Sequence, residues 1–190
     1  MAVIEVAYHQ FWLLDEGCRP DPQTPVGNGL AGVAGLGVVK VWTGIATGPA
    51  TVSLRALTAG PPPDEAAEWD DVVELSLAAP TGAVRAMALM ADPPAELGPL
   101  TTAGPGPYRL RVHVRGRDSA PDESVSAPVE DYLLVAWPAP DEPERILRQT
   151  DSYGAQVRRS EAAAPPSPSP SPARIDALRE QRRRALRGLR

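Results

Sequence analysis

Two segments in the second half of the chain, residues 108–115 and 132–137, constrain the fold more than any other feature of the sequence. The first alternates strictly between apolar and polar side chains, which is the two-residue period of a β-strand. Its apolar set is Tyr108, Leu110, Val112 and Val114, and its polar set is Arg109, Arg111, His113 and Arg115. The second is apolar throughout, which is typical of a strand buried on both faces. Residues 116–128 are polar and rich in Ser, Asp and Pro, so we predict two strands joined by a loop, the first with one solvent-facing side.

Proline and glycine interrupt the rest of the chain too often for long helices. The 190 residues include 23 prolines and 16 glycines. Short runs with strand character recur between these interruptions, over residues 2–14, 37–43, 51–57, 72–78 and 83–90. With the central pair they predict an all-β domain, an antiparallel β-sandwich of about seven strands. A partly closed barrel stays open as the alternative, because strand spacing does not distinguish the two.

Composition divides the chain into three parts. We assign residues 1–158 to the β-sandwich domain, in which residues 145–154 form a short turn of helix or an irregular segment. Residues 159–173 form a linker rich in Pro and Ser, which cannot bury a core. Residues 174–190 carry Ile and Leu at helical spacing among arginines, so they predict a basic amphipathic helix or, alternatively, a disordered flexible tail.

Charge is distributed unevenly between these parts. Residues 1–172 hold 12 basic and 22 acidic side chains, a net charge of −10. Residues 173–190 hold seven arginines against Asp176 and Glu180, a net charge of +5. This asymmetry favours an electrostatic partner, and nucleic acid is expected as a ligand of the Arg-rich end at most. The alternative is that the negative charge only keeps the domain dispersed.

Several classes of protein are disfavoured by what the sequence lacks. Cys18 is the single cysteine, so no intramolecular disulfide can form. No run approaches 18 apolar residues, and residues 1–6 lack a basic segment before an apolar core, so we expect a cytoplasmic protein without a membrane span. Residues 27–32 match G-x-G-x-x-G formally, but no strand precedes and no helix follows them, so we interpret them as loop glycines.

Residues with catalytic chemistry are scarce. The two histidines, His9 and His113, fall on polar positions of predicted strands, which favours exposed strand residues over a base or a ligand. No serine lies in a nucleophile-elbow pattern. We therefore predict no catalytic residue, no cofactor and no metal site.

A short motif near the start of the chain carries a family resemblance. Tyr8, His9, Gln10 and Phe11 form a Y-H-Q-F sequence, and residues 106–110 form a later G-x-Y-x-L strand. In these motifs and their order the chain resembles the competence protein ComJ family of DNA-entry nuclease inhibitors, over roughly residues 3–138. The extended loops and the whole segment after residue 138 depart from that family. The resemblance implies a small β-sandwich that binds and inhibits a nuclease rather than an enzyme.

If the chain binds a nuclease, its densest carboxylate run is the candidate interface. Nuclease grooves are lined with Lys and Arg, so an inhibitor must present negative charge. Five carboxylates lie within eight residues, with a tryptophan among them as a candidate anchor: Asp64, Glu65, Glu68, Trp69, Asp70 and Asp71. The alternative is that Trp69 belongs to the core and the carboxylates are only solvated.

Three functions therefore compete at the level of sequence. The first is a non-catalytic, immunity-type protein that inhibits a basic nuclease. The second is a β-sandwich interaction module recruited to another protein partly by its basic C-terminal tail. The third is an enzyme of unrecognised type. A tight complex with a basic protein would identify the inhibitor. A complex that depends on the tail would identify the interaction module, and an activity that depends on one carboxylate would identify the enzyme.

Overall fold

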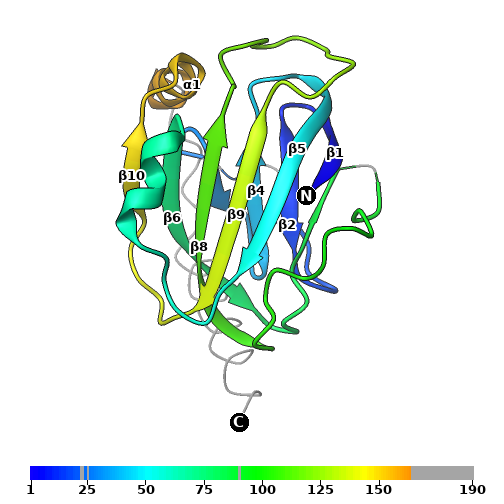
Figure 1. Cartoon of the computed structure of the whole chain (residues 1–190), viewed down its shortest axis with the longest axis vertical. Coiled ribbons are helices and arrows are strands. Elements are labelled where there is room, and N and C mark those ends of the chain that lie inside the picture. Colours follow the sequence, from blue (N-terminus) through cyan, green and yellow to red (C-terminus); the bar gives the residue numbers. More distant parts are fainter. Residues whose placement is uncertain (22–23, 25, 90, 164–190) are drawn as a thin grey trace.

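A computed structural model describes residues 1–21, 24, 26–89 and 91–163 of the protein (Figure 1). This part contains ten strands, a 3-10 helix and an α-helix. Their bounds are β1 Ala2–Ala7, β2 Gln10–Leu14, β3 Ala31–Val33, β4 Val38–Trp42, β5 Thr47–Ala56, η1 Pro63–Glu68, β6 Asp71–Ala79, β7 Arg85–Met87, β8 Gly106–Arg115, β9 Asp131–Pro138, β10 Arg145–Gln149 and α1 Ser152–Ala163. Neither helix is long and apolar enough to cross a membrane.

All ten strands belong to one sheet that curls on itself. The order is β10-β6-β8-β9-β5-β1-β2-β4-β3, and β7 pairs with β2 outside this path. Every pairing is antiparallel except that of β5 with β9, which is parallel. The curl brings β3 and β4 close to β6, and Figure 1 shows β2 and β4 behind β9 and β5. The molecule is a half-barrel.

The all-β prediction is confirmed, and the central strand pair lies where the sequence places it. The two-sheet sandwich and the count of about seven strands are not what the structure has. The predicted strand over residues 2–14 is the hairpin β1–β2, β3 lies inside a predicted loop, and β10 lies in a segment for which no strand was predicted. The single curled sheet is nearer to the alternative of a partly closed barrel.

The concave side of the sheet holds the apolar core. Ile4, Val6, Phe11, Leu110 and Tyr132 are among its buried members. The rings of Phe11 and Tyr132 meet edge to face at 5.1 Å, a favoured aromatic geometry. Full burial of each such side chain contributes about 1.5–3 kcal/mol, so this core supplies the main drive for the sheet to curl.

Three of the four polar side chains of β8 are buried, contrary to the solvent-facing side predicted from its alternation. Arg109, Arg111 and His113 are at most 4% exposed. Arg111 Nη2 lies 2.7 Å from Glu74 Oε1, and Arg109 Nη2 lies 3.5 Å from Glu74 Oε2. Their remaining N–H groups donate to the carbonyl oxygens of Pro61, Pro62, Glu142 and Pro143. The loops that contain residues 61–62 and 142–143 therefore cover this face. The alternation of the strand does not predict such burial, because the partners of its arginines are backbone carbonyl groups of distant loops.

Helix α1 lies beside the end of β10 (Figure 1) and is hydrogen-bonded to the loop that precedes β3. Arg158 Nη1 donates to Asn28 O at 3.2 Å, and Glu161 Oε1 accepts a hydrogen bond from Val26 N at 2.8 Å. The helix continues to Ala163, so residues 159–163 belong to it and not to the predicted linker. Residues 164–173 and the predicted terminal helix over 174–190 lie outside the described residues.

Candidate functional site

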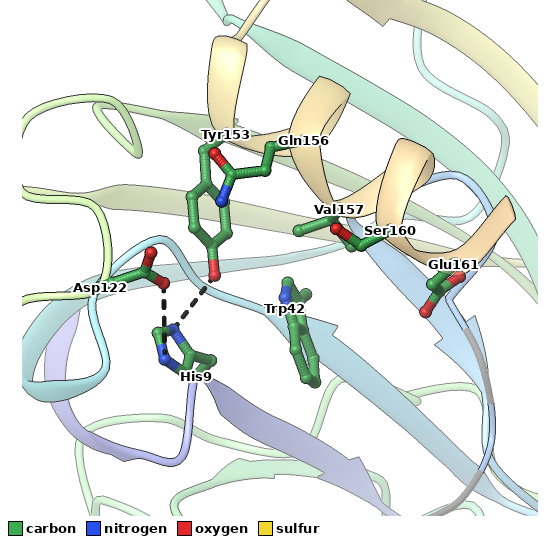
Figure 2. Close-up of a pocket in the computed structure, with 8 residues that line it drawn as sticks. All are labelled: His9, Trp42, Asp122, Tyr153, Gln156, Val157, Ser160 and Glu161. Carbon is green, nitrogen blue, oxygen red and sulfur yellow. Dashed lines mark hydrogen bonds and ion pairs between the residues drawn. The ribbon is translucent and has the colours of Figure 1, made fainter. Parts of the chain in front are cut away.

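A pocket of about 270 Å³ lies between the β1–β2 turn, the loop after β8 and helix α1 (Figure 2). Its walls come from four distant parts of the chain, which only the fold brings together. The lining residues are His9, Trp42, Asp122, Tyr153, Gln156, Val157, Ser160 and Glu161.

The β1–β2 turn supplies His9 to this pocket. Ala7 pairs with Gln10, so Tyr8 and His9 are the two central residues of a two-residue hairpin. Their φ angles are 55° and 58°, the left-handed conformation of a type I′ turn, which usually selects Asn and Gly. His9 N donates to Ala46 O at 3.2 Å and so helps to hold the turn. The Tyr8–Phe11 motif is therefore this turn together with the start of β2.

Backbone strain is concentrated around the pocket. In the described part of the chain, the non-glycine residues with positive φ are Tyr8, His9 and Asp122, and the last two line the pocket. Left-handed non-glycine residues cost on the order of 1 kcal/mol or more each and tend to gather at functional sites. This clustering directs attention to the pocket as a site.

A chain of polar contacts joins three of the lining side chains. The Tyr153 hydroxyl lies 3.1 Å from His9 Nδ1, and His9 Nε2 lies 3.7 Å from Asp122 Oδ1 (Figure 2). Burial, together with the negative charge of Asp122, raises the pKa of Tyr153 to about 12. The phenol is therefore protonated at neutral pH and keeps its O–H as a hydrogen-bond donor within the pocket. A phenol with a raised pKa is suited to hold a ligand rather than to attack one.

Aromatic rings form one wall of the pocket. The His9 ring lies 6.2 Å from Trp42 with an interplanar angle of 21°, and 6.3 Å from Tyr153 with an angle of 16°. Lys40 Nζ lies 4.2 Å from the centre of the Trp42 ring, so this indole already holds one cation. Burial lowers the pKa of Lys40, and the Glu161 carboxylate opposes that shift.

One polar atom at the pocket, Glu161 Oε2, is buried without a hydrogen-bond partner among the described residues. Its companion oxygen accepts a hydrogen bond from Val26 N. Trp42 Nε1 is also buried, but it acts on the Tyr153 hydroxyl as a hydrogen-bond donor that lowers the pKa of that phenol. A buried polar atom without a partner costs about 1–3 kcal/mol, so Glu161 Oε2 favours a ligand that donates to it.

Two carboxylates fix the start of helix α1 and so position Tyr153. Asp151 Oδ1 accepts from Gly154 N at 2.6 Å, which makes Asp151 the N-cap. Asp118 accepts from Ser152 N at 2.9 Å and from Tyr153 N at 2.8 Å. Three of the N–H groups that a helix start leaves unpaired are thereby satisfied.

A buried arginine ties this helix start to the sheet. Arg117 is fully buried, with Nε 2.6 Å from Asp151 Oδ2 and Nη2 3.1 Å from Asp71 Oδ2. Its Nη1 donates to Gly29 O at 2.7 Å. Burial opposes its charge, but the neighbouring groups, including both aspartates, raise the pKa of Arg117, so the ion pairs persist. The pocket wall therefore rests on a fixed charged cluster.

The structure separates the predicted interface residues into two kinds. Asp64, Glu65 and Glu68 lie in η1, and Glu68 is exposed. The other three residues have structural partners. The Trp69 ring lies 5.4 Å from His113 and 5.1 Å from the Arg115 guanidinium carbon, Asp70 Oδ2 accepts from Gly116 N, and Asp71 is fully buried beside Arg117. Asp71 therefore cannot contact a partner directly, which corrects the prediction for that residue.

Sequence reasoning missed most of the pocket. His9 was predicted to be an exposed strand residue, but it lies in a turn and is half-buried. Trp42, Asp122 and Tyr153 were not connected to it. One local signal that could have located the helix is Asp151 followed by Ser152, a typical helix start.

Comparison with known proteins assigns no family to the chain. No protein-family model and no curated protein matches it. A solved structure described as "Crocagin biosynthetic gene J" aligns at a TM-score of 0.43 and 18% sequence identity, over 74% of this chain and 100% of that one. Likeness at this level carries no inference about function. In the part of the chain that the structure describes, no group of three or more His, Cys, Asp or Glu side chains could hold a metal ion.

Proposed function

We propose that this chain is a non-catalytic binding protein that recognises a basic protein, and that its target is a nuclease which it inhibits. The observation that carries the proposal is the pocket, where strained residues, aligned rings and two carboxylates meet at the surface. The resemblance of the Tyr8–Phe11 motif to the nuclease inhibitors supplies the class of partner. Such a partner presents Lys and Arg in its phosphate-binding groove.

The net charge of the body supports an acidic contact surface. Burial removes charges of both signs in similar number: Lys40, Arg109, Arg111 and Arg117 are buried, and so are Asp15, Asp71, Glu74, Glu130 and Asp151. The surface of the body therefore keeps the excess of negative charge that its composition gives it. A surface of one sign accelerates the encounter with a partner of opposite sign.

We assign different roles to η1 and to the pocket. The carboxylate run over residues 64–68 steers the encounter, because charges at the rim of an interface mainly affect the association rate. The pocket anchors the complex, because a partner side chain that fills a pocket mainly affects dissociation. Trp69, which packs on His113 and Arg115, is assigned to the fold and not to the interface.

The test is inhibition of the nuclease that co-purifies with the protein from its native host. Nuclease activity is titrated with the wild-type chain and with the triple variant Asp64→Asn, Glu65→Gln, Glu68→Gln over a salt series. We expect stoichiometric inhibition by the wild type, and association slowed several-fold to about tenfold by the triple variant at low salt, with a smaller difference at high salt.

Two results would contradict the proposal in different ways. If the wild type forms no complex with a co-purifying nuclease and inhibits none, the proposed function is wrong. If the triple variant associates as fast as the wild type at every salt concentration, η1 is not the steering surface. The matched control is Asp141→Asn, Glu142→Gln, Glu144→Gln, an exposed carboxylate group in another loop, which we expect to have a smaller effect.

A further inference from the structure

We propose that the pocket binds the side chain of an arginine presented by the partner protein. This inference rests on the proposed function and specifies the chemistry of its anchor. It is argued from the charge of the pocket lining, its aromatic wall, its hydrogen-bond acceptors and its size.

The formally charged lining residues are both acidic. Asp122 and Glu161 are carboxylates, and the described residues that line the pocket include neither Lys nor Arg. The neighbouring cations are already held. Arg117 pairs with Asp71 and Asp151, and Arg158 Nη1 lies 3.4 Å from Asp71 Oδ2. The pocket therefore attracts a cation and repels an anion.

The aromatic wall favours a guanidinium over an ammonium group. A guanidinium is planar and weakly hydrated, so it stacks on rings such as Trp42 and Tyr153 at little desolvation cost. Lys40 shows that the Trp42 ring attracts a cation, with Nζ 4.2 Å from the ring centre. The positive charge of Lys40 Nζ also repels a second cation nearby. A variant that removes this charge should therefore bind a cation more tightly.

The acceptors of the pocket match the donors of an arginine. Glu161 Oε2 is a buried acceptor without a hydrogen-bond partner, and Asp122 Oδ1 lies 3.7 Å from His9 at the opposite side of the pocket. A guanidinium carries five N–H donors in a fixed fork and can serve more than one carboxylate. Ser160 and Gln156 add further polar groups to the helix side of the pocket.

The size of the pocket favours one side chain over a larger ligand. Its volume of about 270 Å³ is just below the range of roughly 300–1,000 Å³ that is usual for drug-sized ligands. A single anchoring side chain in a pocket is also the usual form of a hot spot in a protein interface. We therefore assign the occupant to a protein and not to a free metabolite.

The experiment titrates the full chain with three capped tripeptides, Gly-Xaa-Gly, in which Xaa is arginine, lysine or citrulline. Citrulline has nearly the shape of arginine without its charge. Binding is followed by NMR at the Trp42 indole N–H, which is assigned with a Trp42→Phe variant. We expect millimolar binding of the arginine peptide, severalfold weaker binding of the lysine peptide, and about tenfold weaker binding of the citrulline peptide.

Variants of the pocket should change the affinity for the arginine peptide in opposite directions. Asp122→Asn and Glu161→Gln should each weaken arginine-peptide binding about tenfold, the usual scale for a charge-assisted hydrogen bond. Lys40→Met should strengthen it, because the neighbouring positive charge is removed. Glu96→Gln, an exposed carboxylate that does not line the pocket, is the matched control and should change nothing.

The outcomes separate this inference from the proposed function. Three results would overturn the arginine assignment, even if the chain inhibits the nuclease. They are equal binding of the citrulline and arginine peptides, no binding of any peptide, and unchanged binding in both carboxylate variants. Arginine-selective binding that both carboxylate variants weaken would support it. If that result came with no nuclease inhibition by the wild type, the proposed partner would be wrong and the chemistry of the pocket would stand.

Discussion

An Arg117→Leu variant is expected to lose about 3–5 kcal/mol of its free energy of unfolding. The substitution leaves Asp71 and Asp151 buried without their cation, and breaking a buried ion pair from one side costs that much. It also leaves Gly29 O without the donor at 2.7 Å. Chemical denaturation at pH 7, followed by far-UV circular dichroism, measures the loss.

The matched control is Arg115→Leu, on the same strand–loop junction. Arg115 pairs with Asp131 at 2.9 Å, but both side chains are substantially exposed, so this pair contributes about 0–1 kcal/mol. Equal losses in the two variants would contradict the account of Arg117 as the support of the pocket wall.

The loss in Arg117→Leu should also depend on pH. Burial raises the pKa of Asp151 even beside Arg117, and loss of the guanidinium removes the main opposing influence. A carboxyl whose pKa is raised in the folded state stabilises the fold at low pH and loses that contribution as pH rises. The loss of unfolding free energy in Arg117→Leu should therefore be smaller at pH 4 than at pH 7.

The second large effect is expected on the proposed complex with a nuclease. Trp42→Ala removes the aromatic wall of the pocket, and loss of a hot-spot residue costs at least about 2 kcal/mol of binding. The dissociation rate should therefore rise about 30-fold or more. Surface plasmon resonance with the immobilised nuclease measures it, after thermal melting has shown that the variant folds.

Trp69→Ala is the competing variant in the same experiment. Because Trp69 packs on His113 and Arg115, we expect the variant to be less stable but to dissociate within about threefold of the wild-type rate. If the dissociation rate increases more in Trp69→Ala than in Trp42→Ala, the anchor is Trp69, within the carboxylate run over residues 64–71. That result would contradict the placement of the anchor at the pocket.

Local patterns predict the strands of this fold well and their arrangement poorly. The alternation over 108–115 and the apolar run over 132–137 identify β8 and β9 to within two residues. The parallel pairing of β5 with β9 has no local signal, because it joins segments that are distant in the chain. Because local patterns do not reveal which strands pair, a sandwich and a half-barrel look alike in the sequence.

The site was less predictable than the fold for a related reason. The Tyr8–Phe11 motif falls within one strand in the sequence prediction, and no side chain near it in sequence shows that His9 meets Tyr153 and Asp122. The carboxylate run over 64–71 looks uniform in sequence, yet Asp71 is fully buried while Glu68 is exposed. Loops and ion-pair partners that are distant in the chain decide which of these carboxylates is buried, so the local sequence does not predict it.

Hydrogen–deuterium exchange of the full chain, alone and bound to the nuclease, tests the central claim most directly. The account predicts that binding slows exchange in the β1–β2 turn, in residues 117–124 and in α1, which together surround the pocket. A smaller effect is expected over η1, where steering charges contact the partner only at the rim. Protection confined to residues beyond 163, or to the opposite end of the sheet with the pocket unchanged, would contradict it.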